Sequence, residues 1–346
     1  MKLYLPLSIA IAAGLLASAP IAEAAKPKPK PHASKQAIAK KKGKVVKTSR
    51  AKVATRPVAR TAAAGAAATL NLPQQTITGR PTQDMDEWLT AGDHRFTIQH
   101  EGLTRSYLVH VPQRYDPTEI TPMLVALNGY RGAVAPGESI NSVLRESDHQ
   151  GFIAVVPQAY GGKDKKPAWS AGQSAGQPVN DVSFIAKVVH NVFRQASVDR
   201  GRIYAAGVSD GGTMAYRLAC DLPNVFRGVA SVGGVDTSTN CKQGNAVSVF
   251  HLHAQNDTRV PFSTAPMTTA KWAQANGCEL APRKVLIQDG AYCEAYTYCR
   301  NRTAVEMCAT EAGSQSWAGT KTAAVRGAPV PAVDGTGSMW AFLRTH

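Results

Sequence analysis

A serine between two glycines is the most chemically suggestive feature of the sequence. Residues 207–211 read Gly-Val-Ser-Asp-Gly and fit the pattern G-x-S-x-G, with Ser209 at its centre. The apolar residues 202–207 precede this pattern as a predicted strand, and residues 212–220 follow it as a predicted helix. A serine on such a strand-to-helix turn exposes its hydroxyl above a sheet, where it acts as a nucleophile in acyl transfer. We therefore predict Ser209 as a nucleophile; the alternative is an ordinary glycine-rich turn.

Acyl transfer also needs hydrogen-bond donors where negative charge develops on the substrate oxygen. The backbone N–H of Asp210 is the first candidate, because Asp210 directly follows the serine. The second donor is expected in a loop after an earlier strand, and residues 126–132, Ala-Leu-Asn-Gly-Tyr-Arg-Gly, form such a loop. We assign this donor to the backbone N–H of Tyr130, with a plain glycine turn as the alternative.

A carboxylate that orients a general base should follow a later strand, in the chain order serine, acid, histidine. The predicted strand 246–254 leads into a polar loop that contains Asp257. We predict Asp257 as the acid; the alternative is a residue that only shapes the turn.

The general base is harder to assign. After Asp257 the sequence contains a single histidine, His346, at the end of a predicted helix. A histidine at that position also interacts favourably with the helix dipole, so it needs no catalytic role. His251 and His253 lie on or near the strand before Asp257, and we interpret them as structural residues. Each of the three stays an alternative base.

The predicted elements alternate between strands and helices, which indicates an α/β domain. Short apolar runs bounded by glycine or proline are typical of buried parallel strands. We expect a largely parallel sheet with helices on both faces, in one domain over residues 76–346. The predicted strands are 105–112, 122–129, 151–158, 202–207 and 246–254, and the predicted helices are 181–196, 212–220 and 337–346.

Four stretches of this domain carry a family resemblance: 179–185, 202–234, 251–262 and the cysteine-rich run 293–308. Together they resemble the secreted polyhydroxybutyrate depolymerase and feruloyl esterase family of α/β-hydrolases. The resemblance covers the chain from about residue 102 onward. It implies an α/β-hydrolase fold, Ser209 as nucleophile and Asp257 as acid. It also implies a polymeric or aryl ester substrate and neither a metal nor an organic cofactor.

The sequence departs from the family at two positions. Where the family has His-Gly in the oxyanion loop, this chain has Asn128-Gly129, a change that a backbone donor tolerates. The family's catalytic histidine lies in a Gly-Gly-His-x-Trp-like segment, but here residues 312–317 read Ala-Gly-Ser-Gln-Ser-Trp. Ser314 or Gln315 therefore occupies the place of the base. A hydroxyl or a carboxamide does not take up a proton near neutral pH, so Gln315 offers hydrogen bonds only.

The sequence thus leaves two functions open. One is an ester hydrolase with reduced turnover, and the other is an inactive relative that binds a polyester, a polysaccharide or an envelope component in the same cleft. Tyr130, Trp169 and Trp317 are candidates to line that cleft and contact the substrate, and core packing is the equal alternative for each.

Six cysteines fit three disulfides in an exported protein, although the sequence allows 15 pairings and free buried thiols are the alternative. The resemblance implies a Cys220–Cys241 bond and leaves the other pairings open. The cysteines are Cys220, Cys241, Cys278, Cys293, Cys299 and Cys308.

The N-terminal part predicts export. Lys2, an apolar run and the small residues around Glu23 fit a signal peptide over residues 1–24, with an uncleaved anchor as the alternative. We therefore expect a secreted protein, extracellular or periplasmic, and no later segment is apolar enough for a stable membrane span.

A basic segment follows the predicted signal. Residues 25–66 carry 13 lysines and arginines and no acidic residue, which accounts for most of the net charge of +15. We predict a disordered Lys/Ala/Pro-rich linker over 25–75, because the segment lacks large apolar residues that build a core. It is either a solvated spacer or a tether to anionic envelope or polymer surfaces. Nucleic-acid binding is not expected.

Overall fold

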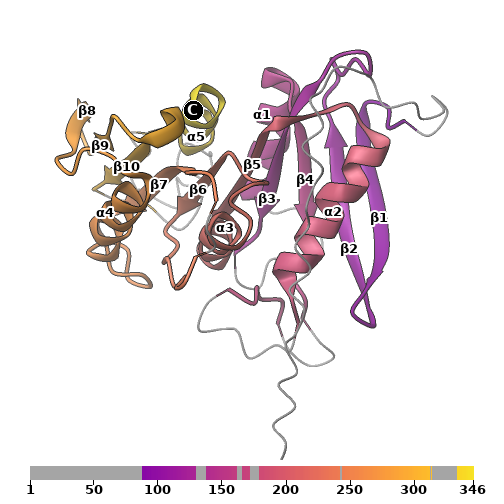
Figure 1. Cartoon of the computed structure of the whole chain (residues 1–346), viewed down its shortest axis with the longest axis horizontal. Helices are drawn as coiled ribbons and strands as arrows, with labels where there is room; N and C mark the ends of the chain where they lie inside the picture. Colours follow the sequence, from indigo (N-terminus) through magenta and orange to yellow (C-terminus); the bar gives the residue numbers. More distant parts are fainter. Residues whose placement is uncertain are drawn as a thin grey trace, which may run out of the picture. The chain divides into compact units, whose positions relative to one another are not determined.

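A mixed ten-stranded sheet forms the centre of the protein in our computed structural model (Figure 1). The structure describes residues 88–129, 138–161, 166–171, 179–241, 244–311, 313 and 333–346. These residues belong to one compact unit, Gln75–His346. The predicted signal peptide (1–24) and linker (25–75) lie outside them.

The strand order across the sheet is β1-β2-β4-β3-β5-β6-β7-β10-β9-β8. Five neighbouring pairs, from β4 to β10, are parallel, and two antiparallel pairs lie at each edge. The predicted parallel sheet is therefore confirmed for its centre. The strands are β1 (Gly92–His100), β2 (Leu103–Val111), β3 (Thr121–Leu127), β4 (Ile153–Pro157), β5 (Val198–Val208), β6 (Gly228–Val232), β7 (Ser248–Ala254), β8 (Arg283–Gln288), β9 (Ala291–Tyr296) and β10 (Val305–Thr310).

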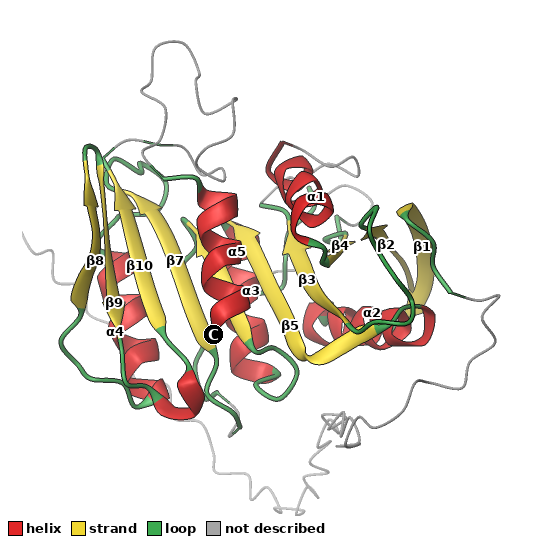
Figure 2. Cartoon of the chain, turned by 90° about the horizontal axis from the view of Figure 1, so that it is seen from above, coloured by secondary structure: helices red, strands yellow, loops and turns green. Residues whose placement is uncertain are grey.

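Helices cover both faces of the sheet, as predicted. Successive residues of β7 point to opposite faces of the sheet. The Phe250 ring packs against Phe342 of α5, whereas the next residue, His251, stacks on Tyr216 of α3. Helix α1 contacts α5, and α2 contacts α3 (Figure 2). The helices are α1 (Glu138–Gln150), α2 (Asp181–Gln195), α3 (Asp210–Asp221), α4 (Thr264–Asn276) and α5 (Gly335–Thr345), with a short 3-10 turn η2 (Arg300–Arg302).

Three of the central strands are buried along their whole length, which explains their continuous apolar sequences. Every residue of β4, β6 and β7 is buried. Polar caps fix the helix starts: the Asn180 side chain accepts the N–H of Ser183 at α2, and Asp334 accepts two N–H groups at the start of α5. Because β3, β5, β6 and β7 run parallel, their carboxyl ends meet at one edge of the sheet.

All six cysteines form disulfides, as predicted. Cys220–Cys241 is the pair that the family resemblance implied. The pairings that the sequence left open are Cys278–Cys299 and Cys293–Cys308. The last of these links directly paired residues of β9 and β10, so it fastens the antiparallel edge to the parallel centre.

Several elements were not predicted. Strand β1 carries only a weak alternation of half-buried and exposed residues, and β8 is almost entirely exposed. Neither gives a strong apolar pattern. Within the described segments, no helix is long and apolar enough to span a bilayer.

Candidate active site

Ser209 lies on a sharp turn between β5 and α3. Its backbone has φ 54° and ψ −118°, a region that non-glycine residues rarely adopt and that costs about 1–3 kcal/mol. Hydrogen bonds hold the turn on both sides: the Ser209 N–H donates to Val232 O (2.8 Å), and Ser209 O accepts from the Thr213 N–H (3.0 Å). The surrounding backbone thus maintains the strained conformation of Ser209.

The glycines around Ser209 are required by close backbone contacts. A Cβ on Gly207 would lie 2.2 Å from the carbonyl carbon of Gly211, and a Cβ on Gly211 would lie 2.3 Å from Leu127 O. Both distances are far too short for a side chain. The end of β3, the end of β5 and the start of α3 therefore touch one another through backbone atoms.

One predicted oxyanion donor lies in the described structure. The Asp210 N–H is in the first turn of α3, where backbone N–H groups have no partner inside the helix. Tyr130 lies outside the described residues, but Gly129 directly precedes it. A Cβ on Gly129 would lie 3.5 Å from the Ser209 Cβ, so the loop that carries Tyr130 leaves β3 beside the serine.

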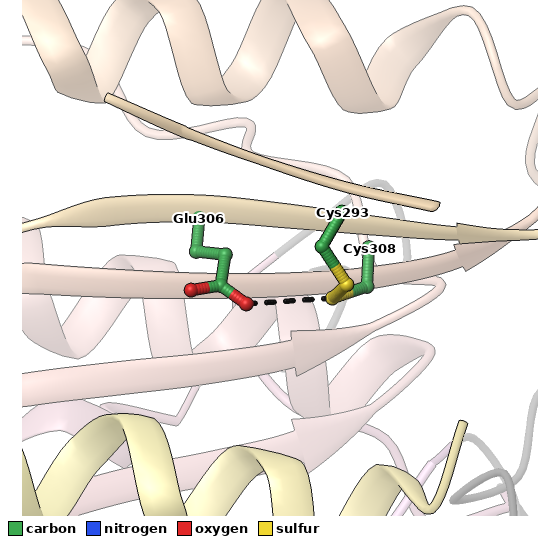
Figure 3. A group of neighbouring side chains, drawn as sticks. All are labelled: Cys293, Glu306 and Cys308. Atoms are coloured by element: carbon green, nitrogen blue, oxygen red, sulfur yellow. Dashed lines mark hydrogen bonds between the residues drawn. A yellow bond between two sulfur atoms is a disulfide. The ribbon is translucent and has the colours of Figure 1, made fainter. Parts of the chain in front are cut away.

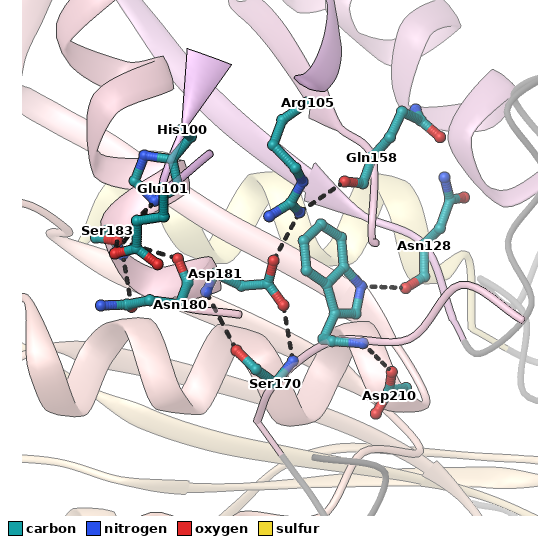
Figure 4. A network of polar contacts seen from close by, with 11 residues as sticks. His100, Glu101, Arg105, Asn128, Gln158, Ser170, Asn180, Asp181, Ser183 and Asp210 are labelled. Atoms are coloured by element: carbon teal, nitrogen blue, oxygen red, sulfur yellow. Dashed lines mark hydrogen bonds and ion pairs between the residues drawn. The ribbon is translucent and has the colours of Figure 1, made fainter. Parts of the chain in front are cut away.

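Trp169 bridges the two segments that carry these donors, and Figure 4 labels its two partners, Asn128 and Asp210. Its backbone N–H donates to Asp210 Oδ2 and its indole N–H donates to Asn128 O, both at 2.8 Å. Its exposed fraction is 0%. This burial contradicts the prediction that Trp169 contacts substrate, because the side chain is fully covered and its polar atom is already bonded. Trp317 lies outside the described residues.

The Asp210 side chain faces this same network. Burial raises the pKa of its carboxyl, the Trp169 hydrogen bond opposes that shift, and the nearby Asp181 charge adds to it. Asp210 thus uses its carboxylate for structure, while its backbone N–H is the group predicted to face the substrate.

Asp257 lies in the loop after β7, at the same sheet edge as Ser209. Its Oδ1 accepts the backbone N–H groups of Arg259 (2.8 Å) and Val260 (3.0 Å), and its side chain is 6% exposed. These N–H groups favour the ionised carboxylate. Its Oδ2 lies 3.6 Å from His253 Nε2.

A buried chain of rings leads to this carboxylate. Tyr216 Oη lies 2.5 Å from His251 Nδ1, and His251 Nε2 lies 3.0 Å from His253 Nδ1. His253 Nε2 contacts Val260 O at 3.1 Å. Because a carbonyl only accepts, His253 Nε2 must carry the proton, so His251 Nε2 donates to His253 and Tyr216 donates to His251. Every donor in the chain points toward the Asp257 loop.

Both histidines of this chain are neutral at pH 7. Burial, with a contribution from His253, lowers the pKa of His251 to about 3. Burial also lowers the pKa of His253, although the Val260 carbonyl and the Asp257 charge oppose the shift. Their ring nitrogens are all engaged and their side chains are buried, which supports the structural interpretation and excludes both as the general base.

His346 is also excluded as the base. It caps α5, with its Nδ1 3.0 Å from Phe342 O. The last turn of α5 lines a cavity of about 400 Å³ together with Thr121 at the start of β3. His346 therefore lies at the edge of the sheet opposite Ser209.

The segment in which the sequence predicts the place of the base starts beside the loop that contains Asp257. Thr310, the last residue of β10, pairs with Ala254 of β7 and accepts the N–H of Gln255 at 2.7 Å. A Cβ on Gly313 would lie 3.4 Å from the Ala254 Cβ. Ser314 and Gln315 themselves lie outside the described residues.

A cluster of Cys293, Glu306 and Cys308 resembles a metal site, since its possible ligand atoms lie within 4.8 Å of one another (Figure 3). Both sulfurs belong to one disulfide, however, so neither is a thiolate ligand. Burial raises the pKa of Glu306 to about 7. Because a disulfide sulfur has no proton, only the protonated Glu306 can donate in the 3.5 Å contact with Cys308 Sγ.

The sequence analysis missed two residues that support the site, Arg105 and Asp181. They form a buried ion pair (Arg105 Nη2 to Asp181 Oδ1, 2.6 Å) that leads to Trp169 through Ser170. They stand 76 positions apart, and no local pattern joins them.

Comparisons with known proteins find similar sequences and a similar fold. Residues 139–245 match the prolyl oligopeptidase family. The chain is 31% identical over 184 residues to a probable feruloyl esterase C of Aspergillus clavatus, covering 51% of this chain and 63% of that protein. It is 24% identical over 233 residues to feruloyl esterase B of Piromyces equi, covering 61% and 42%. This chain thus spans less than two thirds of the length of either curated relative.

A solved structure is also similar: an acetyl xylan esterase from Aspergillus awamori, with a TM-score of 0.51 and 16% identity, over 64% of this chain and 94% of that one. The strand order and the likeness to this structure show an α/β-hydrolase fold, and the curated proteins to which the chain is similar are esterases.

Proposed function

We propose that this protein is a serine carboxylic-ester hydrolase that acts through an acyl-Ser209 intermediate. The observation that carries the proposal is the strained Ser209 turn, at φ 54°, which only glycines at 207 and 211 permit. A turn held at this cost is expected where the exposed hydroxyl has a chemical role.

The reaction has two steps. Ser209 Oγ attacks the ester carbonyl carbon, the bond to the alcohol breaks, and the serine proton leaves with the alcohol. Water then attacks the acyl carbon, releases the acid and restores the serine proton. The backbone N–H groups of Asp210 and Tyr130 stabilise the oxyanion in both steps.

Turnover is expected to be reduced, because none of His251, His253 and His346 is placed to serve as base and Gln315 cannot replace one. Oxyanion stabilisation and binding alone leave about 10³–10⁴-fold acceleration over water in the Ser-His-Asp template. The feruloyl esterase relatives favour aryl esters on plant polysaccharide, and the family resemblance adds polyhydroxyalkanoate oligomers as substrates.

Three disulfides support the proposal that the protein is exported with residues 1–24 as signal. The basic segment 25–66 would then hold the domain near anionic envelope or polymer surfaces. Deletion of this segment should weaken binding to such material at low salt; unchanged binding would refute the tether.

The test of the hydrolase is the initial rate with a short-chain p-nitrophenyl ester, compared between wild type and Ser209→Ala. We expect the rate to fall to the buffer background. Ser263→Ala is the matched control, because Ser263 is exposed and its side chain makes no capping hydrogen bond. Equal rates for wild type and Ser209→Ala would refute the proposal.

A second candidate is binding of a polyester or polysaccharide without turnover. One observation favours it. His251 and His253 are buried and hydrogen-bonded in a chain with Tyr216, and His346 lies at the opposite edge of the sheet, so none of the three is placed to act as base. Polymer binding by both wild type and Ser209→Ala, with no Ser209-dependent hydrolysis, would establish this function.

A further inference from the structure

We infer that Trp169 is a positioning residue that holds the two oxyanion-donor segments at a fixed spacing beside Ser209. The inference rests on the proposed function, since it assigns a task to Trp169 within the same site. The stretch 168–170, called the clamp below, is the part of the chain that does this.

The clamp contacts each donor segment once. The Trp169 indole N–H ends on the carbonyl of Asn128, two residues before Tyr130, and the Trp169 backbone N–H ends on the carboxylate of Asp210. The second bond has a charged acceptor, which makes it roughly twice as strong as a neutral one. One buried residue therefore fixes both segments (Figure 4).

The clamp is itself anchored away from the serine. Asp181 Oδ2 accepts the Ser170 N–H (2.8 Å), and Ser170 Oγ accepts the Asp181 N–H (3.2 Å). Arg105 pairs with Asp181 and lies 3.9 Å over the Phe184 ring. The Ala168 N–H donates to Tyr160 O at 3.2 Å. The Arg105 and Asp181 side chains are 2% and 0% exposed, so water does not screen this anchor.

The fit around Ser209 explains why such a clamp matters. Gly129 approaches the Ser209 Cβ and the Val208 carbonyl, with Cβ distances of 3.5 and 3.1 Å. A displacement of about 1 Å in a site of this kind can cost 10²-fold in rate. Loss of one complete oxyanion donor costs about 10²–10³-fold.

The experiment compares Trp169→Phe with Trp272→Phe. Both changes keep a buried aromatic ring and remove one indole N–H, but Trp272 donates to Asp236 on another part of the fold. We expect Trp169→Phe to lower kcat for a p-nitrophenyl ester about 10- to 100-fold with KM changed less than about twofold. Its affinity for an alkylboronic acid, which mimics the tetrahedral intermediate, should fall in parallel. Trp272→Phe should leave kcat unchanged.

An unchanged kcat in Trp169→Phe, or an equal loss in Trp272→Phe, would overturn the inference. A merely structural role would lower the melting temperature without this split between kcat and KM. If Trp169→Phe does not fold, Asp210→Asn keeps an acceptor oxygen but removes its charge, and it should show a smaller loss of kcat.

A readout without turnover separates this inference from the proposed function. Hydrogen exchange of residues 125–129 and 209–213, followed by mass spectrometry, should be at least about tenfold faster in Trp169→Phe than in wild type or Trp272→Phe. Faster exchange in a protein without Ser209-dependent hydrolysis would refute only the esterase. Unchanged exchange would refute the clamp, whatever the activity.

Discussion

The two halves of the candidate site are built in different ways. The serine half consists of backbone packed on backbone: glycines at 207 and 211, the strained Ser209 and the Trp169 bridge. The acid half consists of side chains, with Tyr216, His251 and His253 donating in sequence toward the Asp257 loop. Both halves keep their supporting contacts, whereas we predict Ser314 or Gln315, not a histidine, at the position between them.

This difference shows where the site is vulnerable. The turn at Ser209 cannot drift without a collision between backbones, so its geometry persists whatever the base. We predict the position of the base on the segment that follows β10, and the described contacts of both halves do not involve Ser314 or Gln315. A hydrolase of this design can lose its proton acceptor and keep its nucleophile and acid in place.

The largest effect is expected from introducing a histidine as general base between Ser209 and Asp257. Gln315→His or Ser314→His should raise kcat about 10²–10⁴-fold in one of the two variants, the usual contribution of a positioned base. Gln315→Asn is the control, because it keeps a carboxamide. Initial rates at pH 7–8 measure the effect. No gain in either histidine variant would show that the two halves are not aligned for a shared base.

Breaking the serine half should cost stability as well as activity. Gly207→Ala places a methyl group 2.2 Å from a backbone carbon of Gly211, and such overpacking costs about 3 kcal/mol or more. Urea unfolding and soluble yield would record the loss. Gly201→Ala is the control, since its nearest contact is the Asp199 carboxylate at 3.3 Å, and it should change stability by less than about 0.5 kcal/mol. Equal effects would contradict the close packing at the turn.

Strand β10 pairs with β7 and precedes the segment that contains Gln315. It carries Glu306, whose ionisation makes stability depend on pH. Burial raises the pKa of Glu306 from its ordinary value near 4.5 to about 7, so the folded state keeps a proton that the unfolded chain releases. Stability should therefore fall as the pH rises from about 4.5 to 7, by about 3 kcal/mol in total. Glu306→Gln should match wild type at pH 4.5 and exceed it at pH 8.

Urea unfolding across pH 4.5–8 tests this expectation. Glu311→Gln is the control, because Glu311 is exposed and directly follows the strand that carries Glu306. A wild-type protein that gains stability as the pH rises through this window, in a manner that Glu306→Gln removes, would contradict it.

The smallest effect is expected in the ring chain. His251→Phe keeps a ring but leaves Tyr216 Oη and His253 Nδ1 without their partner, at a cost of about 1–3 kcal/mol. Adding Tyr216→Phe to that variant should then cost little, because the hydroxyl has already lost its acceptor. A double-mutant cycle in urea measures this coupling. Additive losses would show that the chain is not one connected unit.

Part of this site could be predicted from the sequence because its signals are local. The strand, turn and helix around Ser209 occupy 24 consecutive residues, 198–221, and Asp257 follows its strand by three positions. The same holds for the central strands, whose buried runs are continuous. Local propensity and spacing decide such features.

The remaining features depend on contacts between distant segments. The Trp169 bridge ends on a backbone carbonyl at 128 and a carboxylate at 210, and its anchor uses residues 105 and 181. Bonds to backbone atoms leave no residue pattern. For the same reason the sequence left Trp169 open between a substrate contact and core packing, because it does not show whether an aromatic residue in a loop is buried. The structure decides for packing, since Trp169 is 0% exposed.

The most direct measurement is the intact mass of the protein, quenched at intervals after mixing with p-nitrophenyl butyrate and followed by peptide mapping. Without a general base both steps are slow, but p-nitrophenolate leaves without needing a proton, whereas water must displace an alkyl oxygen from the butyryl ester of Ser209. Acylation should therefore outpace deacylation, and one butyryl group should accumulate on the peptide that contains Ser209. Ser209→Ala should gain none. An adduct of equal size on another peptide, or no adduct in the wild type together with no Ser209-dependent release of p-nitrophenol, would contradict the account.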